Sequence, residues 1–182
     1  MTASNLCSST SGSRFRVALI SLAFLVALAA QAQIVAFGAS NVLGYGVKPE
    51  QAFPAVLEGM LKTKGYHVSV INAGAVGSTT SDMLQRVDSA IPGGTKIVIL
   101  DESGGYFNDT MKHISHAQGD ADMNAIRSKL GARGIVIIPF ASNKIADTYK
   151  LPDRIHLSPT GHQLVAHYLL PKVLSALGST KS

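Results

Sequence analysis

Four short runs of apolar residues alternate along the chain with longer segments whose apolar residues recur every three or four positions. Continuous apolar runs of this length are typical of strands that are buried on both faces of a sheet. The four runs cover residues 34–37, 68–71, 96–100 and 135–138. The pattern therefore predicts four parallel strands in a sheet that is covered on both sides.

The segments between and after these runs have the spacing of amphipathic helices. In the first of them Leu57, Met60 and Leu61 fall on one helical face, and Gly65 marks its end. The predicted helices cover residues 51–64, 79–90, 120–133 and 158–177. Strands and helices that alternate in this way form βαβ units. We expect an α/β fold, a three-layer α/β/α sandwich with a parallel, flavodoxin-like sheet of about four to five strands.

The first 32 residues have the pattern of a signal peptide rather than of a folded segment. Arg14 and Arg16 precede an apolar run at residues 17–30, and Ala30-Gln31-Ala32 is a small-x-small cleavage pattern. A membrane-spanning helix needs about 20 apolar residues, which this run lacks. We expect cleavage after Ala32, export to the periplasm or the medium of a bacterium, and no stable membrane span afterwards. An uncleaved N-terminal anchor is the alternative.

Cleavage leaves residues 33–182 as one domain of 150 residues without cysteine, because Cys7 lies in the leader. Loss of Arg14 and Arg16 lowers the net charge from +5 to +3. The basic residues do not cluster, and tryptophan is absent, so the composition gives no support for a nucleic-acid partner. We expect a monomer.

Ligands of parallel sheets bind beyond the carboxyl ends of the strands, and the segments that follow the first three runs are rich in small polar residues. Ser40 follows the first strand, with glycine beside it. Asp153 and His156, three residues apart before the last helix, can supply a base and a group that orients it. Taken singly, these residues also suit a helix cap, a turn and a surface histidine.

Other polar residues are expected to have structural roles. His113 and His116 are three residues apart, but no further ligand completes a metal site, so a solvated loop is expected. We expect Asp101 and Glu102 to form a polar rim near the site. We expect Asp120 and Asp122 to be acids in the first turn of a helix. We expect His162 and His167 to be surface or packing residues of the last helix.

Four blocks, in order, resemble the motifs of the SGNH hydrolases, also called GDSL-like esterases and lipases. Residues 38–41 (GASN) look like Gly-Asp-Ser, with Ala39 in place of the aspartate, and residues 72–80 (NAGAVGSTT) look like Asn-Ala-Gly-x-x-Gly-Asp-Thr. Residues 104–109 (GGYFND) resemble Gly-Gly-Asn-Asp with two residues inserted. Residues 153–162 (DRIHLSPTGH) match Asp-Gly-Ile-His-Pro-x-x-x-Gly.

The resemblance implies a two-step transfer of an acyl group from an ester or thioester to water, without metal or cofactor. The substrate would be a small-molecule or lipid ester. Ser40 would be the nucleophile, His156 the general base and Asp153 the residue that orients the imidazole. The oxyanion hole would consist of the backbone N–H groups of Ser40 and Gly77 and the side chain of Asn108. The alternative is a catalytically weak SGNH-like domain that binds acylated carbohydrate or lipid. The short segment between Asn108 and Asp153 predicts an open, shallow pocket.

Overall fold

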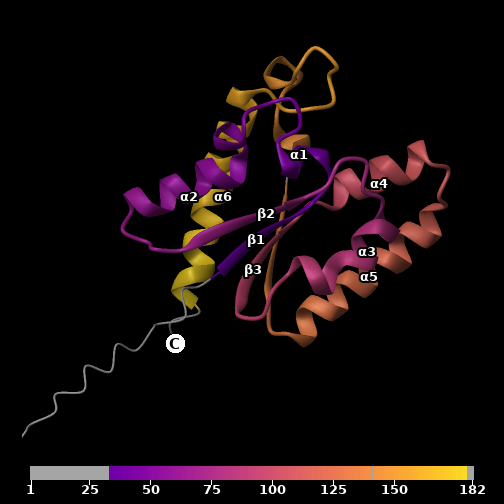
Figure 1. Ribbon diagram of the computed structural model, residues 1–182, viewed down its shortest axis with the longest axis horizontal. Coiled ribbons are helices and arrows are strands. Elements are labelled where there is room, and N and C mark those ends of the chain that lie inside the picture. Colours follow the sequence, from indigo (N-terminus) through magenta and orange to yellow (C-terminus); the bar gives the residue numbers. More distant parts are fainter. Residues whose placement is uncertain (1–32, 141, 180–182) are drawn as a thin grey trace, which may run out of the picture.

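The computed structural model describes residues 33–140 and 142–179, and the predicted signal peptide at residues 1–32 lies outside this part of the chain (Figure 1). Its centre is a parallel sheet of four strands in the order β2-β1-β3-β4. The strands are β1 (Gln33–Gly38), β2 (Ser69–Gly74), β3 (Thr95–Leu100) and β4 (Val136–Pro139). The predicted α/β fold with a parallel sheet is confirmed.

Successive residues of a strand point to opposite faces of the sheet, which explains why the central strands are apolar throughout. In β1, Ile34 and Ala36 belong to one buried cluster, and Val35 and Phe37 belong to the other. All four side chains are fully buried. The sheet therefore requires helices on both faces.

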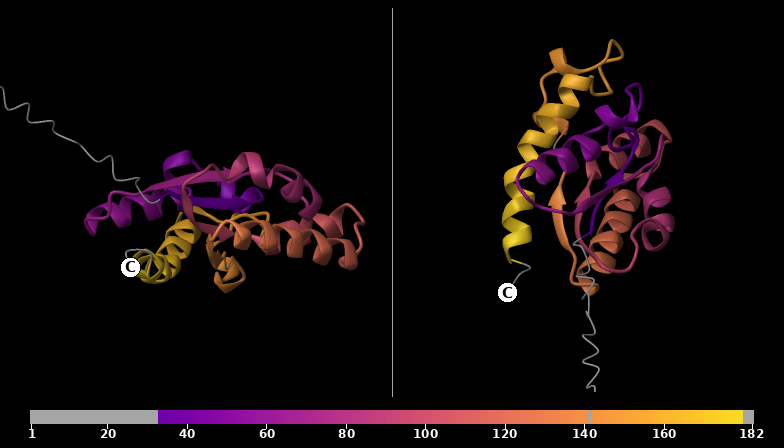
Figure 2. Two further views of the ribbon diagram at one scale, coloured as in Figure 1. Left: turned by 90° about the horizontal axis from the view of Figure 1, so that it is seen from below. Right: turned by 60° about the vertical axis from the view of Figure 1, so that its left-hand side comes forward.

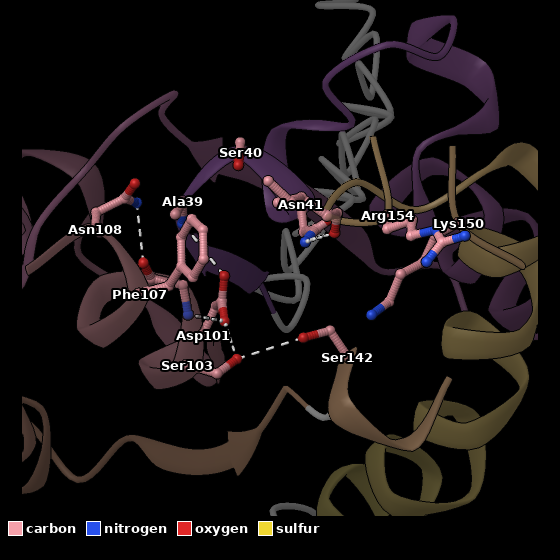
Figure 3. Close-up of a pocket in the computed structure, with 12 residues that line it drawn as sticks. Ala39, Ser40, Asn41, Asp101, Ser103, Phe107, Asn108, Ser142, Lys150 and Arg154 are labelled. Atoms are coloured by element: carbon pink, nitrogen blue, oxygen red, sulfur yellow. Dashed lines mark hydrogen bonds between the residues drawn. The ribbon is translucent and has the colours of Figure 1, made fainter. Parts of the chain in front are cut away.

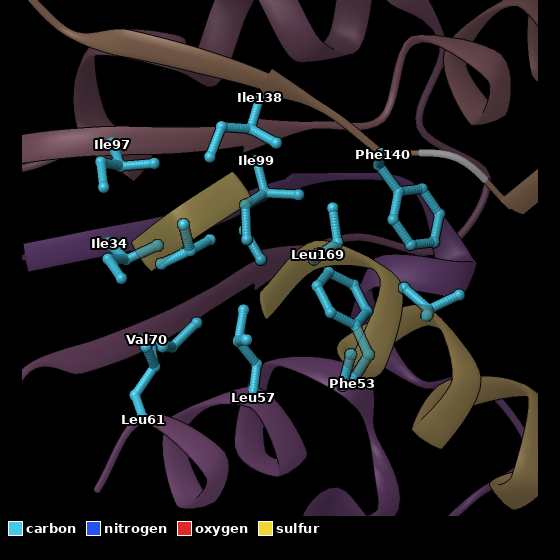
Figure 4. Packing of buried hydrophobic residues seen from close by; sticks show 14 of the residues in the cluster. Ile34, Phe53, Leu57, Leu61, Val70, Ile97, Ile99, Ile138, Phe140 and Leu169 are labelled. Atoms are coloured by element: carbon cyan, nitrogen blue, oxygen red, sulfur yellow. The ribbon is translucent and has the colours of Figure 1, made fainter. Parts of the chain in front are cut away.

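Helices α2 (Phe53–Thr63) and α6 (Pro159–Ser179) cover one face (Figure 1). Phe53 and Leu57 of α2 pack with Leu169 of α6 against the isoleucines of the sheet (Figure 4). Phe53 also stacks on Phe140, with 4.9 Å between the ring centroids. Both helices lie within two residues of the predicted ranges.

Helices α3 (Thr80–Ala90), α4 (Glu102–Met111) and α5 (His116–Ala132) cover the other face (Figure 1). Residues 103–109, in the polar segment after the third apolar run, were expected to form an irregular turn like the others, but they belong to α4. Asp101 caps the helix by accepting a hydrogen bond from the Gly104 N–H group. At Gly105 a Cβ atom would come within 3.2–3.3 Å of Met83, Thr80 and Met123, so this glycine lets α4 lie close to α3 and α5.

Shorter elements surround the carboxyl ends of the strands. They are the helix α1 (Ser40–Leu43) and the 3-10 helices η1 (Pro49–Gln51), η2 (Ser142–Lys144) and η3 (Asp147–Tyr149). The segment between β4 and α6 lies at the same end of the molecule as α1 (Figure 2). Within the described residues, every helix is too short or too polar to cross a bilayer.

Candidate active site

Ser40 is the first residue of α1, immediately beyond the end of β1. The close approach of neighbouring segments explains the glycine at position 38, where a Cβ atom would lie 2.3 Å from Asp101 Cβ. Gly44 ends the short helix with a left-handed φ of 86°. The turn thus places the Ser40 hydroxyl at the carboxyl end of the sheet, where a ligand can approach it.

His156 and Asp153 lie on the loop that precedes α6 and reach Ser40 from the other end of the sequence. His156 Nε2 lies 3.0 Å from Ser40 Oγ, and His156 Nδ1 lies 2.7 Å from Asp153 Oδ2. Because a carboxylate can only accept, Nδ1 carries the proton and Nε2 is left to accept from the serine hydroxyl. The structure therefore brings the three predicted residues together in one hydrogen-bonded chain.

Asn41, the neighbour of Ser40, fastens this loop to the nucleophile turn. Its side chain accepts a hydrogen bond from the Leu157 N–H group at 2.9 Å and donates one to the Ile155 carbonyl at 3.2 Å. Tyr45 lies against the His156 ring, with 4.6 Å between the centroids. These contacts fix the imidazole relative to Ser40.

Asp153 binds its own loop as well as the histidine. Its Oδ1 accepts hydrogen bonds from the N–H groups of Ile155 and His156 at 2.9 and 3.0 Å. The side-chain hydrogen bond to His156, together with these backbone bonds, lowers the pKa of Asp153 to about 2. The carboxylate is therefore ionised at neutral pH and can stabilise a positively charged imidazole.

The three predicted oxyanion donors differ in their present partners. Among the described residues, the backbone N–H groups of Ser40 and Gly77 have no hydrogen-bond acceptor. Asn108 lies on α4, and its side-chain nitrogen donates to the carbonyl oxygens of Ser78 at 3.0 Å and of Gly104 at 2.9 Å. Both hydrogens of the Asn108 amide are thus already engaged.

Asp101 is not part of an exposed polar rim, as the sequence suggested, but is almost fully buried below Ser40. Its carboxylate accepts from Gly104 N–H and Ser103 Oγ at 2.9 Å and from Ala39 N–H at 3.4 Å. Burial raises the pKa of Asp101 despite these bonds. The group joins α4 to the turn that carries the serine. Its neighbour Glu102 instead pairs with Arg127 on α5.

Arg86 is a contributor to the site that sequence reasoning missed. It donates to the carbonyl oxygens of Gly38 and Ala73 at the ends of β1 and β2, and its guanidinium lies 4.4 Å from the Phe37 ring centroid. Burial lowers the pKa of Arg86. The sequence held one indication of this role: Arg86 lies beside Val87 and three residues after Met83, so it falls next to the apolar face of α3.

The other polar candidates occupy varied positions. His116 begins α5 and stacks on Tyr106, and His113 lies in the preceding turn with a φ of 57°. Within the part of the chain that is described, no group of histidine, cysteine, aspartate or glutamate could hold a metal ion. His167 is exposed. His162 is fully buried, with Nδ1 accepting from Phe53 N–H at 3.3 Å.

The two acids predicted for the first turn of a helix have other positions, because α5 starts at His116. Asp120 accepts a hydrogen bond from the Tyr106 hydroxyl at 2.8 Å. Asp122 is buried against α3, where it accepts hydrogen bonds from the hydroxyl groups of Thr80 and Ser81.

A pocket of about 260 Å³ opens beside Ser40 (Figure 3). The turn after β1 and helix α4 line one side of it, and the loop between β4 and α6 lines the other. Its residues are Ala39, Ser40, Asn41, Asp101, Ser103, Gly104, Phe107, Asn108, Ser142, Lys150, Arg154 and Ile155. Lys150 and Arg154 thus lie opposite a side of the pocket that is formed mostly by neutral residues.

No protein-family model matches the sequence, and no curated protein sequence matches it. Similarity is found among solved structures. AlinE4, an SGNH-hydrolase family esterase, is 29% identical, with a TM-score of 0.52 over 78% of this chain and 72% of that chain. The esterase EstA from Pseudoalteromonas sp. is 14% identical, with a TM-score of 0.68 over 80% of this chain and 98% of that one. TesA is 16% identical, with a TM-score of 0.67 over 79% and 99%.

These similarities confirm the resemblance to SGNH hydrolases that the four sequence blocks indicate.

Proposed function

We propose that this chain, which has the fold of the SGNH hydrolases, is an exported serine esterase that hydrolyses carboxylic ester or thioester bonds. The observation that carries the proposal is the hydrogen-bonded chain from Ser40 through His156 to Asp153. The similarity to SGNH esterases supports ester hydrolysis as the class of reaction. No metal or cofactor is needed for this chemistry.

In the first step His156 Nε2 takes the proton of Ser40 Oγ as that oxygen bonds to the acyl carbon. The bond to the leaving alcohol or thiol then breaks, and His156 returns the proton to that group. In the second step a water molecule gives a proton to His156 and attacks the acyl-serine. The acid is released and Ser40 recovers its hydrogen. Asp153 keeps Nε2 free of a proton at the start of each step and stabilises the imidazolium.

The proposed oxyanion hole consists of the N–H groups of Ser40 and Gly77 and the amide of Asn108. The two backbone groups have no competing acceptor within the described residues. Asn108 must exchange the Ser78 carbonyl for the oxyanion, while it keeps its bond to Gly104 within α4. The exchange is favourable because hydrogen bonds to a charged acceptor are stronger than neutral ones.

Hydrolysis of p-nitrophenyl acetate and butyrate by residues 33–182, beside Ser40→Ala, tests the proposal. We expect the variant to lose about 10⁴-fold or more in kcat, because removal of the nucleophile disables the whole triad. Equal activity in both proteins would refute the role of Ser40.

The engaged Asn108 amide favours a second candidate, a domain that binds acylated carbohydrate or lipid without turning it over. That domain would be folded but catalytically weak, and Ser40→Ala would keep its affinity for the ligand. Isothermal titration of the wild type and the variant with an acetylated oligosaccharide separates the two candidates.

Export is proposed from the leader pattern alone. N-terminal sequencing of the protein from a bacterial periplasm or medium should start at Gln33. Recovery of the protein with residues 1–32 attached would support the anchor instead.

A further inference from the structure

Arg154 has a backbone conformation that disfavours its side chain. It lies between Asp153 and Ile155 with a φ of 59°, in the left-handed region. This turn lets Asp153 Oδ1 accept two backbone N–H groups while Oδ2 faces His156. Glycine adopts such a conformation freely, whereas other residues lose about 1 kcal/mol or more. The resembled motif has glycine here, so this chain keeps a guanidinium at a position where folding alone favours glycine.

The Arg154 side chain lines the same pocket as Ser40, together with Lys150 and Ile155 (Figure 3). Residue 154 is exposed, and among the described residues its guanidinium forms no ion pair. Lys150 is less exposed and pairs with Asp147 at 2.7 Å. Asp147 attracts the Arg154 guanidinium, but the two groups form no ion pair, so this cation at the edge of the pocket is available to a ligand.

The acids near this side of the pocket already have partners. Asp147 is bound to Lys150, and that bond lowers the pKa of Asp147. Asp153 is bound to His156, and Asp101 is buried under three donors. None of these carboxylates is hydrogen-bonded to the Arg154 guanidinium. A bound anion would therefore meet the guanidinium without displacing an ion pair.

The position of the cations also indicates which part of the substrate they meet. His156 must return a proton to the leaving oxygen or sulfur, so the alcohol portion passes along the loop that carries His156. Lys150 and Arg154 lie on this loop, whereas Asn108, one of the predicted oxyanion donors, lies on the other side of Ser40 (Figure 3). We propose that Arg154, assisted by Lys150, selects esters whose leaving alcohol or thiol carries an anionic group, a carboxylate or a phosphate.

This inference rests on the proposed esterase function, and matched esters separate the two. 4-Acetoxybenzoate and its methyl ester differ by one carboxylate on the leaving phenol, and 4-acetoxyphenyl phosphate supplies the other anion. We expect the wild-type kcat/KM for at least one of the two anionic esters to exceed that for the methyl ester. The ratio of these two kcat/KM values measures the preference for an anion. In Arg154→Gly that ratio should fall about tenfold, since a hydrogen bond to a charged group is lost. Arg154→Lys should retain part of it.

Lys64→Ala is the control, because it removes one exposed cation between α2 and β2, at the opposite edge of the sheet, and should leave the ratio unchanged. Salt of about 0.5 M should reduce the wild-type ratio by screening. Because glycine suits position 154, the melting temperature of Arg154→Gly should not fall. A structural role for Arg154 would lower that temperature and reduce activity on all esters equally, which would overturn the inference.

Wild-type protein that cleaves the methyl ester but has no preference for either anion would refute the inference alone. Protein that cleaves none of the esters would refute the proposed function.

Discussion

Two of the clusters in which a hydroxyl meets carboxylates differ in arrangement, and only the cluster at the pocket has the order of groups that the proposed chemistry needs. At the pocket, Ser40 meets Asp153 through an imidazole. Behind it, Thr80 Oγ1 lies 2.7 Å from Asp109 Oδ2 and 3.2 Å from Asp122 Oδ2, with no base between them. Both clusters contain a hydroxyl and carboxylates, but only in the first does an imidazole lie between them.

The surroundings of the two clusters differ as well. Thr80 is fully buried and ties α3 to α4 and α5, with Ser81 and Gln118 completing the bonds to Asp122. No substrate can reach it, and a proton leaving its hydroxyl would form an alkoxide between two carboxylates. A hydroxyl beside a carboxylate is therefore not a nucleophile unless a base can remove its proton and a pocket admits a substrate.

After the loss of the nucleophile itself, the largest effect on kcat should come from the group that orients the base. In Asp153→Asn the amide can donate to Nδ1, which moves the imidazole proton to Nε2, where it faces Ser40. We expect kcat to fall about 10³-fold or more in the nitrophenyl acetate assay. Asp88→Asn, which removes an exposed acid paired with Lys129, is the matched control and should leave kcat unchanged. A fall of less than tenfold in Asp153→Asn would remove Asp153 from the triad.

A smaller effect is expected at the proposed oxyanion hole. Asn108→Ala should lower kcat about 100-fold and change KM less than twofold, because the lost bond forms in the transition state. Circular dichroism checks that α4 persists in the variant. If kcat fell by less than threefold, Asn108 would serve only to hold the Ser78 carbonyl.

The buried cluster should respond in stability rather than in activity. Thr80→Val leaves Asp109 and Asp122 facing an apolar group, so the free energy of unfolding should fall by about 3 kcal/mol in urea titrations. The kcat of the folded variant should stay within about twofold of wild type. Ser40→Ala, in contrast, should change stability by less than about 0.5 kcal/mol. A large loss of kcat in Thr80→Val would contradict the division between the clusters.

The two histidines near the start of α6 sharpen the same contrast. His156 is partly exposed and lies 3.0 Å from Ser40 Oγ, whereas His162 is fully buried and its Nε2 has no hydrogen-bond partner within the described residues. Burial lowers the pKa of His162 from 6.5 to about 4. The unfolded chain therefore binds this proton at a higher pH than the folded one, and stability is lost as the pH falls from about 6.5 to about 4.

The expected loss between pH 7 and pH 4.5 is about 2 kcal/mol relative to His162→Gln, which cannot titrate. Urea titrations of both proteins at the two pH values measure it. Parallel changes in wild type and variant would show that His162 does not control this dependence.

The strands and most helices could be predicted because burial on both faces leaves a plain apolar signature in a short chain. Helix α4 could not, since Gly104 and Gly105 indicate a loop, and the reason for Gly105 is a close contact with residues far away in the sequence. The burial of Asp101 could not be predicted either, because it also depends on contacts with residues distant in the sequence. Its partners Ala39 and Gly104 come from two different turns.

The candidate triad could be predicted because its motifs keep their order along the chain and parallel strands bring their ends together. The engagement of Asn108, the carbonyl contacts of Arg86 and the exposure of Arg154 depend on how the side chains pack. A motif specifies residue types and spacing but does not specify which hydrogen-bond partners each side chain has.

The most direct test of the account is covalent labelling of the nucleophile. A fluorophosphonate should bind once per molecule of residues 33–182, and tandem mass spectrometry should locate the added mass at Ser40. The Ser40→Ala variant should not be labelled, whereas Thr80→Val should be labelled like the wild type. Protein that hydrolyses nitrophenyl acetate yet is labelled at another residue, or not at all, would contradict the assignment of Ser40.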